Sequence, residues 1–72
     1  MSDSVRYVVQ FHANTGRWDV LRDGQETGAF AHDMHTAIGS ASALASKEVG
    51  ETAIMATVWL TLKGRQKKVW PT

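Results

Sequence analysis

The sequence predicts an α+β domain with an antiparallel sheet of four to five strands and one helix packed on one face, in the order ββ(β)αββ. Apolar residues alternate from Val5 to Phe11 and again from Ile54 to Leu62, as on strands with one buried face. Between these segments, from Met34 to Val49, apolar residues recur at the three-to-four spacing of a helix. The 72 residues give room for one domain, 1–72. Residues 1–4 are expected to form a disordered N-terminal segment.

The first half of the chain predicts a hairpin followed by a possible third strand. Residues 5–12 alternate in polarity, and residues 17–22 place Trp18 and Val20 on a shared face. The turn between them, residues 13–16, carries the Asn and Gly that favour positive φ, and Asp23-Gly24 forms a second turn. A third strand over 26–31 would lie at an edge, because Gly28 weakens it.

The middle of the chain predicts one helix that starts at Met34. Asp33 is the expected N-cap, since its carboxylate can accept a backbone N–H of the first turn and suits the positive end of the helix dipole. Gly50 is expected to end the helix in the left-handed conformation. The expected buried stripe consists of Met34, Ala37, Ile38, Ala41, Leu44, Ala45 and Val49.

The last third of the chain predicts a strand, a tight turn and a final strand. The segment 52–62 places one apolar set on one face: Ile54, Ala56, Val58, Leu60 and Leu62. The other face also carries bulk: Met55, Thr57, Trp59 and Thr61. Residues 63–65 form the turn, and 66–70 pair back until Pro71, which cannot donate to a ladder.

Composition limits the class of protein. The chain has no cysteine, so disulfides and thiolate metal sites are excluded, and a domain this short has a thin stability margin that favours self-association. The first four residues show no basic or apolar lead of an export signal, and no apolar run approaches the roughly 20 residues of a membrane span. We therefore expect a cytoplasmic protein with no membrane partner.

Several short motifs resemble a known bacterial family. They are Tyr7-Val8-Val9, Gly16-Arg17-Trp18-Asp19-Val20, Asp33 followed by Ala37-Ile38, Ala41 and Leu44-Ala45, and Gly64-Arg65 near the end. With these motifs the chain resembles the small bacterial family called domain of unknown function 2188, over nearly its whole length. Each motif is structural in kind, so the resemblance implies a fold and no activity.

One helix covers only one face of a sheet, so the opposite face is either solvated or covered by another chain. Val8, Met55 and Trp59, with Leu21 beside them, are left for that face, and we interpret them as a contact surface for a second copy or another protein partner. The competing interpretation is that Trp59 folds under a loop or under the C-terminal strand.

The net charge of +1 hides a basic segment near the C-terminus. Basic side chains beside an aromatic ring are what phosphate contact and base stacking require, which makes a nucleic-acid-binding accessory domain the alternative function. Arg6 and Arg17 would extend that positive surface. The competing interpretation is a solvated sheet edge, where lysines prevent aggregation. The hairpin residues are Lys63, Arg65, Lys67, Lys68 and Trp70.

Signatures of catalysis and of metal or cofactor binding are weak. His32, Asp33 and His35 lie close in sequence, but the two rings need not face one another and a metal site needs more ligands at fixed geometry, so we expect no metal site. Residues 39–43 lack the second glycine of a nucleophile elbow and fall inside the expected helix. The acids fall on turns and helix ends, where capping and solubility account for them. We expect a non-enzymatic protein with no cofactor and no implied small-molecule substrate.

Overall fold

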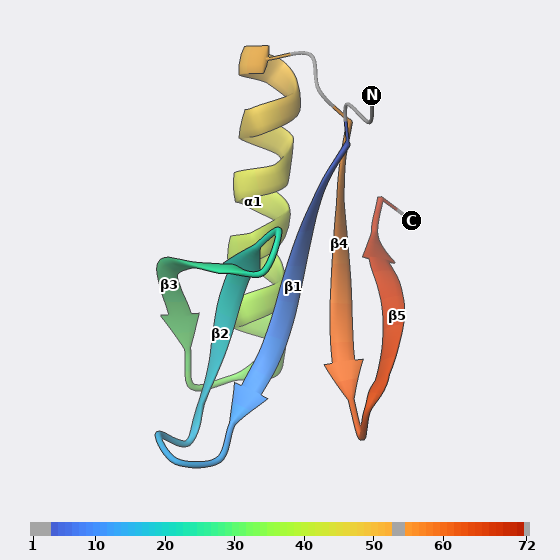
Figure 1. Cartoon of the computed structure of the whole chain (residues 1–72). Coiled ribbons are helices and arrows are strands. Elements are labelled where there is room, and N and C mark those ends of the chain that lie inside the picture. The colour runs from blue at the N-terminus through green and yellow to red at the C-terminus, as the bar shows by residue number, and fades with distance from the viewer. Residues whose placement is uncertain (1–3, 53–54, 72) are drawn as a thin grey trace.

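The computed structural model describes residues 4–52 and 55–71, which form one five-stranded sheet with a helix on one face (Figure 1). In chain order the elements are β1 (Ser4–His12), β2 (Arg17–Arg22), β3 (Gln25–Ala31), α1 (Met34–Thr52), β4 (Met55–Leu62) and β5 (Arg65–Trp70). The predicted element order and the single helix are confirmed. Met1–Asp3, the rest of the expected N-terminal segment, lie outside the described residues, and Ser4 is the first residue of β1.

The sheet is mixed, so the prediction of a purely antiparallel sheet is wrong. Its strand order is β3-β2-β1-β4-β5, and β1 pairs parallel with β4 from Ser4 opposite Met55 to Val9 opposite Leu60. The other three ladders are antiparallel. The parallel ladder arises because α1 carries the chain back along the sheet before β4 begins, which lets β4 run in the same direction as β1.

The core between α1 and the sheet is built from small side chains. The three fully buried residues of the helix are Ala37, Ala41 and Ala45, four residues apart on one face. The largest fully buried side chains are valines, one on each of three neighbouring strands: Val9, Val20 and Val58. The predicted helical stripe is confirmed, because its other four members pack against this core. Alanines let the helix approach the sheet closely, so the core is thin.

The helix begins where the sequence predicts and ends later than predicted. Asp33 caps the N-terminus as predicted: Thr36 N–H donates to Asp33 Oδ2 at 3.0 Å, and this bond holds the pKa of Asp33 below its usual value. The helix runs through Gly50 to Thr52, so the predicted end at Gly50 is wrong, and that glycine does not take a positive φ. Consequently the strand predicted from Thr52 begins at Met55, and Ile54 lies outside the described residues.

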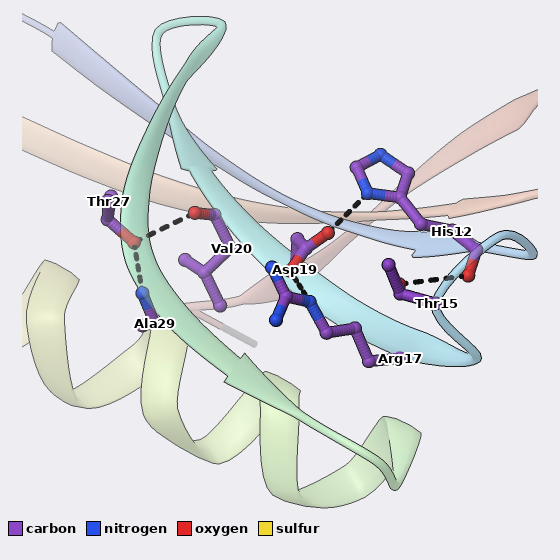
Figure 2. Close-up of polar contacts among 7 residues, drawn as sticks. All are labelled: His12, Thr15, Arg17, Asp19, Val20, Thr27 and Ala29. Carbon is purple, nitrogen blue, oxygen red and sulfur yellow. Dashed lines mark hydrogen bonds and ion pairs between the residues drawn. The ribbon is translucent and has the colours of Figure 1, made fainter.

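A bulge shapes the outer strand β3. The register between β2 and β3 shifts between Asp19 and Leu21, so Val20 has no opposite residue in β3. Thr27 Oγ1 donates to the Val20 carbonyl at 2.8 Å and accepts from Ala29 N–H at 3.2 Å (Figure 2). Gly28 takes a φ of 87° at this point, which is open to glycine and strained for other residues. The predicted third strand is confirmed, one residue longer than expected.

Candidate functional site

The sheet face opposite α1, which we call the open face, carries a row of five side chains that crosses all five strands. Register pairs join Lys68 to Trp59, Trp59 to Val8, Val8 to Leu21, and Leu21 to Glu26. Their sequence neighbours Val9, Val20 and Val58 are buried under the helix, so alternation places the row on the other side. We call these five residues the central row: Lys68, Trp59, Val8, Leu21 and Glu26.

The central row is apolar in its middle and charged at its two ends. Val8, Leu21 and Trp59 are half-buried by their neighbours, whereas Lys68 and Glu26 are exposed. Opposite charges therefore lie on the two edge strands, with three apolar side chains between them. The row therefore runs from a positive end on β5 to a negative end on β3.

Trp59 is held in place by polar partners on its own face. Its indole Nε1–H donates to Thr57 Oγ1 at 3.0 Å, and the Arg6 guanidinium lies 4.3 Å from the ring centroid. Arg6 Nη1 also donates to Gln66 Oε1 at 3.3 Å, which draws this cation toward β5. The ring therefore stands on the open face, beside Lys68 of the C-terminal strand and with the Arg6 guanidinium over it.

Met55 continues the apolar surface along β4. It lies opposite Ser4 at the start of the parallel ladder and is 65% exposed, more than any other large apolar residue among those described. The three residues that the sequence left for a contact surface, Val8, Met55 and Trp59, thus share the open face.

A second cluster on the open face was missed by the sequence interpretation. Asp19, only 3% exposed, accepts a hydrogen bond of 2.9 Å from Arg17 Nε and pairs with His12 Nδ1 through its other oxygen (Figure 2). Arg17 also lies 4.2 Å from the centroid of the Phe30 ring. Asp19 belongs to the middle of a strand, so the expectation that acids fall on turns and helix ends fails here. An arginine two residues before an acid on one strand face is the signal that could have revealed the pair.

The basic C-terminal hairpin does not gather its predicted residues on one face. Lys68 lies in register with Trp59 on the open face, whereas Lys67 lies in register with the buried Leu60 on the helix side. Trp70 is half-buried and packs against the core. Lys63 occupies the turn, and Arg65 opens β5 opposite Leu62. The four cations are thus distributed around the edge of the sheet.

The described residues contain neither a metal-binding cluster nor a membrane-spanning helix. Within residues 4–52 and 55–71, no group of three or more histidine, cysteine, aspartate or glutamate side chains is arranged to hold a metal ion. His32 instead lies edge-on to Phe30, with ring centroids 6.1 Å apart. Among the described residues, no helix combines the length and the apolar character that crossing a membrane requires.

Comparisons of the chain with family models, with curated proteins and with solved structures give no match. The resemblance to domain of unknown function 2188 therefore stays a prediction.

Proposed function

We propose that this protein is a small non-enzymatic module that acts by pairing with a second copy of itself across the open face. The charge order of the central row supports this proposal. Consider a two-fold axis that runs parallel to the strands above Val8. Rotation about it brings Lys68 of one copy opposite Glu26 of the other, and Trp59 opposite Leu21.

The same operation avoids the main obstacle to pairing. Arg6 lies on β1, close to such an axis, where two like charges would meet. Its stacking on Trp59 and its bond to Gln66 draw the guanidinium toward β5, away from the axis. The two Arg6 guanidinium groups are therefore held apart in the pair.

The size of the face indicates the strength of the pair. Five strands spaced about 4.8 Å apart and about 25 Å long give roughly 600 Å² per copy, or about 1,200 Å² in total. This value lies at the small end of specific interfaces, so we expect a dissociation constant in the micromolar range. Self-association would also supply burial that the thin alanine and valine core does not.

Sedimentation velocity over a range of about 1 µM to about 1 mM tests the proposal. We expect the mass to rise from 7.9 kDa toward twice that value. Trp59→Ala should keep the sample monomeric, and circular dichroism verifies that the variant is folded. A single 7.9 kDa species of the parent protein at every concentration would contradict pairing.

A charge exchange tests the orientation of the pair. Lys68→Glu and Glu26→Lys should each weaken association about tenfold, because every contact occurs twice about the axis and each substitution sets like charges opposite one another. The double variant should recover most of the loss. Lys67→Glu, on the same strand but on the opposite face, is the matched control and should leave association unchanged. A double variant no stronger than the single ones would exclude this orientation.

A further inference from the structure

The two parallel strands in the middle of the sheet separate at their carboxyl ends. Their ladder ends at Val9 and Leu60, yet β1 continues to His12 and β4 to Leu62. The chain then leaves β1 toward β2 on one side and β4 toward β5 on the other, as the diverging arrowheads in Figure 1 show. In open α/β sheets, ligands bind beyond the carboxyl ends of strands where the order reverses in this way.

A cleft of about 420 Å³ lies at this divergence. It is lined by side chains of three strands and of the turn after β4, among them Gln10, Phe11, Trp18, Thr61, Leu62 and Lys63. Its volume is within the range of sites that hold small molecules.

The apolar wall of the cleft is not covered by α1. The Phe11 and Trp18 rings pack with centroids 5.1 Å apart and planes tilted by 53°. Phe11 is 45% exposed and Leu62 is 47% exposed, although both occupy strand positions on the helix side. These three side chains form a surface that suits a planar aromatic ring.

Thr61, which lines the cleft, carries a polar atom that faces away from it. Thr61 Oγ1 is closed off from solvent and makes no hydrogen bond within residues 4–52 and 55–71. A buried hydroxyl without a partner lowers the stability of the fold at this position.

Lys63, the cation that lines the cleft, occupies a turn position where lysine is not a favoured residue. Lys63 has a φ of 49° and precedes Gly64 at 77°, which matches the turn of Asp23 at 50° and Gly24 at 86°. Such two-residue turns favour Asn, Asp or Gly at the first position, as Asp23 illustrates. A lysine that breaks this local preference while lining a cleft is a candidate for ligand contact.

We propose that the cleft binds a small aromatic carboxylate. The ring lies against Phe11, Trp18 and Leu62, and Lys63 neutralises the carboxylate. This site is separate from the central row and does not depend on pairing.

Titration with 2-naphthoate, followed in amide correlation spectra of the isotope-labelled protein, tests the proposal. We expect saturable shifts centred on Phe11, Trp18 and residues 61–64. The neutral 2-naphthamide, which has the same ring, should bind about three- to tenfold more weakly, since it lacks the charge that pairs with Lys63. Absence of saturation at millimolar naphthoate, or shifts centred on the central row, would overturn the proposal.

Two variants separate a binding role from a structural one. Lys63→Asn places a favoured residue in the turn, so it should fold as well as the parent while removing the preference for naphthoate over naphthamide. Lys67→Asn, which removes a charge outside the cleft, is the control and should keep that preference. Thr61→Val removes the buried unpartnered hydroxyl, so it should hold or raise the melting temperature and keep the preference for naphthoate. Equal effects of the two lysine variants would contradict the assignment.

Discussion

The Tyr7 hydroxyl donates a hydrogen bond of 2.5 Å to Glu48 Oε1 and thereby joins the central strand β1 to the last third of α1. Arg22 from β2 approaches the same carboxylate, with Nε at 3.0 Å from Oε1 and Nη2 at 2.5 Å from Oε2. The hydrogen bonds from Arg22, followed by the one from Tyr7, hold the pKa of Glu48 at about 2. Burial, reinforced by the Glu48 carboxylate, raises the pKa of Tyr7.

The Glu48 carboxylate should make the stability of the fold depend on pH. Its pKa is about 2 in the folded protein against an ordinary value of 4.5, so its contribution is complete above about pH 4.5 and is lost as pH falls through about 2. We expect Glu48→Gln to lower the free energy of unfolding by about 1 kcal/mol near pH 7, since solvent screens much of this interaction. Near pH 2 the parent and the variant should converge.

Urea unfolding followed by circular dichroism measures this difference. Glu51→Gln, an exposed position on the same helix, is the control and should match the parent at every pH. A deficit of Glu48→Gln that stays constant down to about pH 2 would show that charge is not its cause.

Substitution of the middle alanine in the helix–sheet contact should be costly. Ala41 is fully buried against the sheet, so Ala41→Leu overfills a packed interior and should lower the free energy of unfolding by about 1–3 kcal/mol. For a domain of this size, each kcal/mol lowers the melting temperature by about 4–8 °C. Calorimetry of Ala41→Leu beside Ala43→Leu, at an exposed position on the same helix, measures the effect. Equal melting temperatures for the two variants would contradict close packing at Ala41.

Removal of the Asp19 carboxylate should loosen the open face. Asp19→Ala leaves Arg17 without its acceptor and His12 without its ion-pair partner, so we expect a loss of about 1–3 kcal/mol in the free energy of unfolding. Glu51→Ala, which removes an exposed acid from the helix, should change stability by no more than about 0.5 kcal/mol. Chemical unfolding of both variants measures these differences. An Asp19→Ala variant with the free energy of unfolding of the parent would mean that this cluster does not stabilise the fold.

The basic hairpin gives a separate prediction about nucleic acid. Four phosphate contacts would give a slope of about −3.6 for log K against log salt on duplex DNA, but Lys67 and Lys68 face opposite sides of β5. We expect weak binding with a slope shallower than about −2, reduced further in the double variant Lys67→Glu, Lys68→Glu. Fluorescence anisotropy with a labelled duplex over a salt series measures it. A slope near −3.6 would favour nucleic-acid binding as the function.

The strands, the helix and its cap could be predicted because each depends on residues close in sequence. Asp33 lies three residues before the N–H that it caps, and the alternation along β1 and β4 shows which side chains face the core. The direction of β4 relative to β1 has no local signature, because a strand presents the same alternation in either direction. The parallel ladder was therefore missed.

The surface sites depend on contacts across strands, so the sequence disclosed them only in part. It assigned Trp59 to the open face because the helix-facing positions were already filled. It did not reveal that Lys68 and Glu26 end one row, since this depends on the registers of four ladders. The cleft beside Thr61 follows from the separation of two parallel strands, which a purely antiparallel arrangement does not contain.

The placement of β4 between β1 and β5 also determines when the chain can fold during synthesis. β1 is an inner strand, and one of its two neighbours is supplied by residues 55–60, close to fifty positions later. A nascent chain that stops before β4 leaves the peptide groups along one edge of β1 unpaired. It also leaves the buried alanines of α1 without Val58 and Leu60, which belong to the same core. Stable structure must therefore await the synthesis of β4, and shortened chains that lack this strand should be rapidly degraded.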